Sequence, residues 1–320
     1  MSLNIKPKTW PGAIREVTLG AGSRQPRTVG GGKGLPLHTF EAGFPHRPLL
    51  ALEITDVDPP RWVDTVRAPW QDVLGRPDAA ARKAVEEYGA DLVMLHVAGT
   101  HADRGNRSPD EAVESVRQVL DAVRVPLIVK GPGSGSKQND VLARVAEEFR
   151  GEGLVLHSAA QEDYKTLAAV TVAYGHVLVA ESPIDLNIAK QVNILLSDAS
   201  VDLHRVLIDP MTGGLGYGLE YTYSVMQRIR LAALGGDRML NCPVVCLIGE
   251  EAWKAKEVKV DGVPAALWGD RAKRGVHWEL ATALPLLEAG ADLLVLRHPD
   301  ALAELRRHVD AWFPKAQRAS

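Results

Sequence analysis

The chain has 320 residues, 46% of them hydrophobic, and a formal net charge of −3 at pH 7. This length and apolar content allow a large buried core, in one large α/β domain or two ordinary ones. The mixed charges argue against nucleic acid or an anionic membrane as the main partner. The sequence has no apolar window of 18 residues, and the N-terminus MSLNIKPKTWPGAIREV lacks the apolar core of a signal peptide, so we expect a cytoplasmic protein.

Residues 1–47 have no strong hydrophobic period and contain the Gly- and Pro-rich stretch TVGGGKGLPLHTFEAGFPHRP. We expect them to form an arm that packs on one end of the domain made by residues 48–320. Within that domain, near-continuous Leu, Val and Ile runs predict strands over residues 48–54, 91–96, 126–130, 153–158, 176–181, 206–210, 243–249 and 292–297. Such runs are typical of parallel strands that helices cover.

Helical patterns follow the predicted strands over residues 78–88, 109–123, 138–150, 161–174, 184–199, 218–235, 277–289 and 299–312. Ser108 and Pro109 are typical of the start of the second helix, and Gly290 follows the end of the seventh. Eight strands that each precede a helix predict an α/β TIM (β/α)8 barrel, with a doubly wound open sheet as the alternative. The charged segment 250–276 is an insertion after strand seven.

In a TIM barrel, functional sites lie at the carboxyl ends of the strands. The polar and glycine residues that directly follow the predicted strands, together with one tryptophan, are Glu53, Thr55, Asp56, His96, Thr100, His101, Asp103, Lys130, Ser134, Ser136, His157, Ser158, Glu181, Asp185, Asn187, Asp209, Thr212, Gly213, Gly214, Glu250, Glu251, Trp253, Arg297 and His298. We therefore expect a polar mouth of mixed charge.

Three patterns in this set each have a structural alternative. His96, His101 and Asp103 could ligate a metal, but their spacing matches no helical zinc pattern, and we expect none. The stretch VKGPGSGSKQND lacks the ending of a phosphate-binding P-loop. Lys130 could form a Schiff base, as in an aldolase-like lyase, although no acid or base partner stands at a fixed spacing.

The stretch DPMTGGLGYGLEY joins the sixth strand to its helix. Gly213 and Gly214 would let the backbone approach a ligand, and amides at the start of the helix would favour an anionic or carbonyl group. The alternative is a tight turn that needs positive φ.

Cys242 and Cys246 are the only cysteines, and their CPVVC spacing puts both on one face of a predicted strand. We interpret them as buried thiols. Because an iron–sulfur cluster needs about four Cys ligands, this chain alone cannot hold one, and a disulfide framework is excluded as well.

Four stretches carry a family resemblance: TVGGGKGLPLHTFEAGFPHRPLLALEITDV, IDPMTGGLGYGLEYTYSVMQRIRLAAL, NCPVVCLIGEEAWKAKE and WGDRAKRGVHWELATALPLLEAGADLLVLRHP. From about residue 28 to the C-terminus the chain closely resembles the small subunit of the corrinoid iron–sulfur protein. This family is also known as the delta subunit of the acetyl-CoA decarbonylase/synthase complex.

The resemblance implies a TIM barrel that pairs with a large subunit, which carries the iron–sulfur cluster and most of a cobalamin site. The heterodimer would carry a methyl group from a methyltetrahydrofolate or methanopterin methyltransferase to acetyl-CoA synthase/CO dehydrogenase, in the reductive acetyl-CoA (Wood–Ljungdahl) pathway. This chain would cap the corrinoid at the subunit interface and act as a scaffold, without a catalytic residue of its own.

From the strand-end geometry we place Asp56, Asn187, Thr212, Gly213, Gly214 and Glu250 near the corrinoid. The alternative function is a stand-alone pterin-dependent methyltransferase, in which Asp209 and Asn187 would hold the pterin.

Overall fold

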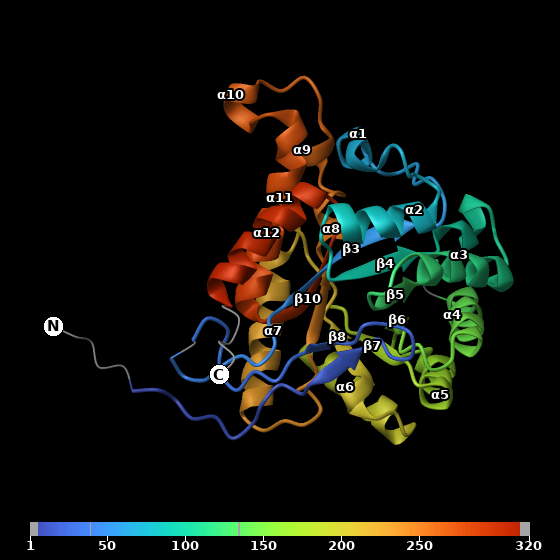
Figure 1. The fold of residues 1–320 in the computed structure, drawn as a ribbon. Coiled ribbons are helices and arrows are strands. Elements are labelled where there is room, and N and C mark those ends of the chain that lie inside the picture. Colours follow the sequence, from blue (N-terminus) through green and yellow to red (C-terminus); the bar gives the residue numbers. More distant parts are fainter. Residues whose placement is uncertain (1–5, 39, 134, 314–320) are drawn as a thin grey trace, which may run out of the picture.

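The computed structural model describes residues 6–38, 40–133 and 135–313. Within them, parallel strands close into an eight-stranded barrel in the order β10-β3-β4-β5-β6-β7-β8-β9, with helices around the outside (Figure 1). The predicted TIM (β/α)8 barrel is confirmed, and an open sheet is excluded. The barrel strands are β3 (Leu49–Thr55), β4 (Leu92–His96), β5 (Leu127–Lys130), β6 (Val155–Ala159), β7 (Val177–Glu181), β8 (Val206–Asp209), β9 (Val244–Leu247) and β10 (Ala291–Leu296).

The helices are α1 (Asp64–Arg67), α2 (Pro77–Arg82), α3 (Pro109–Ala122), α4 (Ser136–Glu148), α5 (Tyr164–Tyr174), α6 (Leu186–Asp198), α7 (Leu219–Leu234), α8 (Ile248–Ala252), α9 (Lys256–Lys259), α10 (Ala265–Trp268), α11 (Arg271–Ala289) and α12 (Pro299–Trp312). A π-helical turn, Lys83–Glu87, continues α2, and single 3₁₀ turns span Ala68–Trp70, Ala98–Thr100, Ala102–Arg104 and Leu203–Arg205. No helix of the described segments is long and apolar enough to cross a bilayer.

Local signals in the sequence account for most helix ends. Ser108 and Glu111 form a reciprocal capping box at the start of α3, and Gly290 ends α11 with a φ of 105°. Helix α11 begins at Arg271 rather than at residue 277, because the side chain of Asp270 accepts a hydrogen bond from the Ala272 N–H and caps an earlier start. The predicted insertion, residues 250–276, therefore contains the end of α8, all of α9 and α10, and the first turns of α11.

The N-terminal segment forms an antiparallel pair, β1 (Val17–Leu19) with β2 (Arg27–Val29), at the amino ends of the barrel strands. The N–H of Gly20 donates to the carbonyl of Gly153 at 3.0 Å, and that of Gln25 donates to Arg124 at 2.7 Å. The buried side chains of β1 and β2 join the apolar cluster inside the barrel. This segment therefore closes the end of the barrel opposite the mouth.

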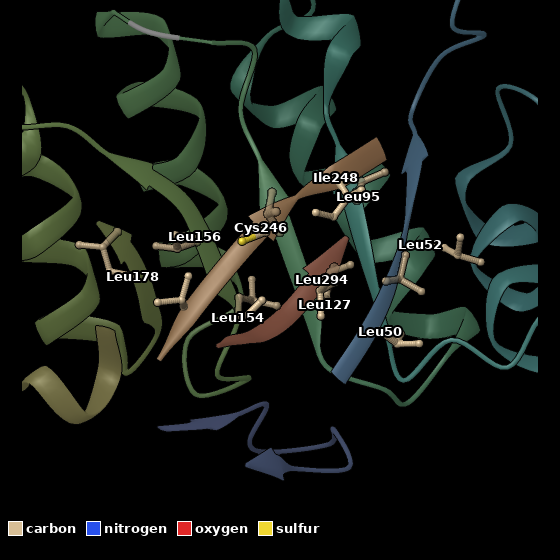
Figure 2. Close-up of a cluster of buried hydrophobic side chains, with 14 of the residues drawn as sticks. Leu50, Leu52, Leu95, Leu127, Leu154, Leu156, Leu178, Cys246, Ile248 and Leu294 are labelled. Atoms are coloured by element: carbon tan, nitrogen blue, oxygen red, sulfur yellow. The ribbon is translucent and has the colours of Figure 1, made fainter. Parts of the chain in front are cut away.

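Two apolar layers account for the near-continuous hydrophobic strands. Figure 2 shows part of the outer layer, in which side chains such as Leu50, Leu52 and Leu156 pack between the strands and the helices. The inner layer fills the barrel with alternate residues, such as Ala51 and Val179. Because both faces of each strand are buried, the strands lack the alternation of a half-exposed sheet.

Candidate binding site at the barrel mouth

A layer of ionisable side chains lies directly above the apolar interior. Along β3, Leu49 and Ala51 belong to the inner cluster, and Glu53 is the next residue of the same face. The same register places the other strand-end residues His96, Lys130, His157, Glu181, Asp209 and Arg297 above the interior. The carboxyl end of the barrel is therefore polar by construction.

Glu53 and Arg297 form a buried ion pair in this layer. The Nε of Arg297 donates to Glu53 at 2.6 Å and its Nη2 at 2.9 Å, while Nδ1 of His96 lies 3.5 Å from the same carboxylate. Burial raises the pKa of Glu53, but the charge of Arg297 and its hydrogen bonds more than offset this and hold the pKa well below its ordinary value. Glu53 is therefore ionised at neutral pH.

Other polar side chains of the layer are also paired, with partners on different strands. The Nε2 of His157 lies 2.9 Å from Oδ2 of Asp209, and the other carboxylate oxygen of Asp209 accepts the Met211 N–H at 2.8 Å. Ser158 donates to Glu181. Because each partner comes from a different strand, these bonds hold the strand ends in a fixed arrangement.

Lys130 forms an ion pair with Glu250 on α8. Burial raises the pKa of Glu250, but the charge of Lys130 opposes this and lowers the pKa to about 2. The ammonium group of Lys130 is thus held by a carboxylate within the mouth.

A cavity of about 400 Å³ opens over this paired layer, on the side of strands β4 to β9. Of the residues that we placed near a ligand, Thr212 and Glu250 line it, together with Lys130, His157 and Asp209. A cavity of this size lies at the lower end of the range for small-molecule pockets, so it would hold a small ligand or one part of a larger one.

The opposite side of the mouth is closed by a small apolar cluster. Val66, Trp253, Ala255 and Val258 are buried in it, so it joins the segment after β3 to the insertion after β9. The indole of Trp253 donates to the buried carboxylate of Glu279 at 3.0 Å. The insertion is therefore a folded part of the carboxyl-end face, and it restricts the open mouth to the remaining strands.

Asp56 and Asn187 lie away from the cavity. The buried carboxylate of Asp56 accepts the Gly99 N–H at 2.9 Å and lies 3.4 Å from Arg107. Asp56 therefore holds the loop after β3 against the loop after β4. Burial raises its pKa. Asn187 is exposed at the start of α6. Asp209 and Asn187 are thus not brought together around the cavity, as a pterin site built on both would require.

In the turn after β8, the glycines with positive φ are not Gly213 and Gly214, which the sequence suggested, but two later ones. Gly216 and Gly218 have φ values of 75° and 99°, whereas Gly213 and Gly214 do not have positive φ. A Cβ at Gly213 would lie 2.4 Å from the carbonyl oxygen of Gly218, so this glycine is needed by the turn itself. A Cβ at Gly214 would meet only Glu251 atoms at ordinary contact distance, 3.5 Å or more.

Some mouth residues were missed by the analysis of strand ends. Arg61, Arg104, Gln138, Met211 and Lys254 line the cavity but come from loops or the first turn of a helix. Met211 lies within the stretch DPMTGGLGYGLEY and could have been included from it. Nothing in the sequence marked the others, because their positions depend on how the loops fold over the barrel. Ser134, which we did include, lies outside the described residues.

The candidate metal ligands His101 and Asp103 contact each other locally, and the two cysteines are buried. Nδ1 of His101 accepts the Asp103 N–H at 3.1 Å, which caps a 3₁₀ turn. Within residues 6–38, 40–133 and 135–313, no group of three or more His, Cys, Asp or Glu side chains is placed to hold a metal ion. Both cysteines are free and buried, and burial raises the pKa of Cys242 to about 12.

Solved structures of similar shape define the class of barrel. Dihydropteroate synthase from Clostridium difficile, solved in the presence of pteroic acid, matches with a TM-score of 0.56 at 16% identity, over 83% of this chain and 97% of that one. The Xanthomonas albilineans dihydropteroate synthase with 4-aminobenzoic acid matches with a TM-score of 0.55 at 15% identity, over 83% and 93%. At this identity the likeness concerns the fold alone, which is a TIM barrel.

Sequence comparison is more specific. The profile of the family described as "CO dehydrogenase/acetyl-CoA synthase delta subunit" matches residues 16–306. The acetyl-CoA decarbonylase/synthase complex subunit delta of Archaeoglobus fulgidus is 38% identical over 308 residues, covering 93% of this chain and 68% of the relative. The subunit delta 1 of Methanosarcina thermophila is 36% identical over 315 residues, covering 95% and 72%. The chain belongs to the CO dehydrogenase/acetyl-CoA synthase delta subunit family, as the resemblance implied.

Proposed function

We propose that this chain is the small subunit of a heterodimeric corrinoid iron–sulfur protein. In this role it covers a corrinoid that a larger subunit holds, and the heterodimer carries a methyl group from a pterin-dependent methyltransferase to acetyl-CoA synthase. Family membership over residues 16–306 is the observation that carries the proposal. The names of the relatives describe subunits of a multi-subunit complex, which agrees with a chain that works with partners.

The carboxyl-end face is suited to a flat ligand with an apolar surface and amide edges. Exposed apolar side chains lie in its loops, such as Ile184, Met211 and Tyr217, and in α10, where they are Leu267 and Trp268. Exposed apolar groups beside a polar mouth are typical of a surface that another molecule covers. The cavity of about 400 Å³ is too small to enclose a corrin macrocycle. We therefore expect the ring to lie across the mouth and not within it.

A bound corrinoid would supply the cobalt centre that accepts and releases the methyl group. The residues of this chain would exclude water and hold the ring's surroundings in place. The pairs Glu53–Arg297, His157–Asp209 and Lys130–Glu250 suit this task, because their charges are already satisfied within the chain. An iron–sulfur cluster needs Cys ligands that this chain lacks, because the two thiols of the chain are buried and protonated. We therefore place the iron–sulfur cluster in the large subunit.

The test is anaerobic purification of the tagged chain from its native host, followed by identification of co-purifying proteins and a visible spectrum. We expect one larger subunit at equal stoichiometry, with corrinoid and iron–sulfur absorbance in the same fraction. A solitary, colourless protein that binds methyltetrahydrofolate would contradict the proposal and favour a stand-alone methyltransferase.

A further inference from the structure

Two neighbouring loops of the mouth each present an apolar side chain from a left-handed backbone. Ile184 follows β7 and has a φ of 48°, and Met211 follows β8 and has a φ of 57°. Their side chains are 37% and 41% exposed. The N–H of Ile184 donates to the carbonyl of Pro210 at 3.0 Å, so the two loops are bonded to each other.

Both residues occupy positions where glycine or asparagine is normally favoured. Each directly follows a proline, Pro183 or Pro210, and a left-handed residue after proline is the pattern of a type II turn. A β-branched or long side chain in this region strains the backbone. Strain of this kind is concentrated at sites that clamp ligands.

Burial of these side chains within the chain is incomplete, because Ile184 and Met211 remain 37% and 41% exposed. Met211 also lines the mouth cavity, so the pair stands at the junction between the polar cavity and the outer surface. A flat ligand laid over the mouth would therefore meet these two side chains at the edge of the cavity. Its burial of them would supply the apolar contact that the isolated chain lacks.

We propose that Ile184 and Met211 form a rim that packs against the apolar face of the corrin ring and keeps water from its edge. This inference rests on the proposed function and adds the residues that make the contact. An apolar ring face fits better than a charged ligand, because the carboxylates and cations behind the rim are paired with one another. The rim would act on how long the corrinoid stays in place, and not on the assembly of the two subunits.

The experiment uses the heterodimer produced with its large subunit under anaerobic conditions. The double variant Ile184→Gly/Met211→Gly removes both side chains, and its glycines adopt positive φ without strain. We expect corrinoid loss during gel filtration to become about tenfold faster, with an unchanged elution volume of the heterodimer. The Tm of the isolated variant chain should be equal to that of the wild type or higher by about 1–3 °C.

A second variant and a control separate the side chains from the backbone. Ile184→Asn/Met211→Asn introduces a residue that tolerates positive φ but is polar, and we expect corrinoid loss to become faster by the same factor. Ser200→Gly relieves a φ of 67° at an exposed position after α6, at the other end of the barrel, and should leave corrinoid loss unchanged.

Three outcomes overturn the inference. Wild-type rates of corrinoid loss in both double variants would show that the rim does not contact the ring. Dissociation of the heterodimer in these variants would show that the rim contacts protein. If the wild-type chain itself fails to slow corrinoid loss from the large subunit, then the proposed function fails first, and this result is distinguishable because it needs no variant.

Discussion

The guanidinium of Arg297, directly after β10, donates two hydrogen bonds to the carboxylate of Glu53 on β3, at 2.6 and 2.9 Å. Strands β10 and β3 pair in parallel, so this ion pair joins the last and first strands of the barrel where it closes. Both side chains are buried. Loss of one partner would leave the other charged and without compensation inside the barrel mouth.

We therefore expect Glu53→Gln to lower the free energy of unfolding by about 3 kcal/mol, because breaking a buried ion pair costs more than replacing it. The double variant Glu53→Leu/Arg297→Met should recover most of this loss. Urea denaturation of the purified chain at pH 7 measures both. Additive losses in the double variant would show that the two side chains do not depend on each other.

Glu279 provides a test through pH. Burial raises its pKa to about 7, although its carboxylate accepts N–H groups of Arg297 and His298 and the indole of Trp253. In the unfolded chain this group releases its proton near pH 4.5, but in the folded protein only near pH 7. Between these values the folded state binds more protons, so its stability falls as the pH rises and then levels off above about pH 7.

The expected contribution is a loss of about 2.5 kcal/mol between pH 5 and pH 8, which is most of the free-energy equivalent of that pKa difference. The variant Glu279→Gln should lack this part of the pH dependence. Glu288→Gln, at an exposed position of the same helix α11, should keep it. Denaturant titrations at several pH values measure the difference between each variant and the wild type. Equal pH profiles for Glu279→Gln and the wild type would contradict the expectation.

Two adjacent glycines should respond differently to the same substitution. Gly213→Ala puts a Cβ 2.4 Å from the backbone oxygen of Gly218, which cannot move without opening the turn. We expect a loss of about 2–3 kcal/mol. Gly214→Ala places its Cβ at ordinary contact distance from Glu251 and should cost less than about 1 kcal/mol. Thermal unfolding of the two variants side by side measures this, and similar losses would show that the turn is more open than described.

Arg24 should hold the N-terminal segment on the barrel. Its guanidinium donates to the carbonyls of Leu120 and Val123 near the end of α3, and its Nε donates to Glu152 at 2.9 Å. Arg24→Met leaves these acceptors without their donor, so we expect a loss of about 2–3 kcal/mol and earlier proteolytic cleavage within residues 6–30. Arg27→Met, at an exposed position of β2, is the matched control. Equal cleavage rates would show that this segment is held in another way.

The order of elements follows from the sequence to a large extent. Strand β4 was expected at residues 91–96 and spans Leu92–His96, and α12 was expected at residues 299–312 and spans Pro299–Trp312. These elements were predictable because buried strands and capped helices depend on residues that are close in sequence. Family membership was likewise predictable, since motifs such as the Trp-Lys-Ala-Lys-Glu run are local.

The mouth was only partly predictable. His157 and Asp209 were expected at the carboxyl ends of their strands, but their 2.9 Å contact depends on barrel closure, which brings together positions 52 residues apart. Asp56 satisfied the same strand-end rule and is nevertheless buried against Gly99 in a loop. The rule specifies the end of the barrel, and the loop conformations decide which side chains face the cavity.

By itself, the sequence determined the barrel, its order of strands and helices, the polar character of one end and the family. Only the tertiary structure decided that the mouth charges are paired, that the insertion closes one side of the mouth, and that Ile184 and Met211 stand at its rim in left-handed backbone. The physical reason is the separation in sequence of the groups that interact. Hydrophobic periodicity and capping act over a few residues, whereas ion pairs and backbone strain depend on groups that meet only when the barrel has closed.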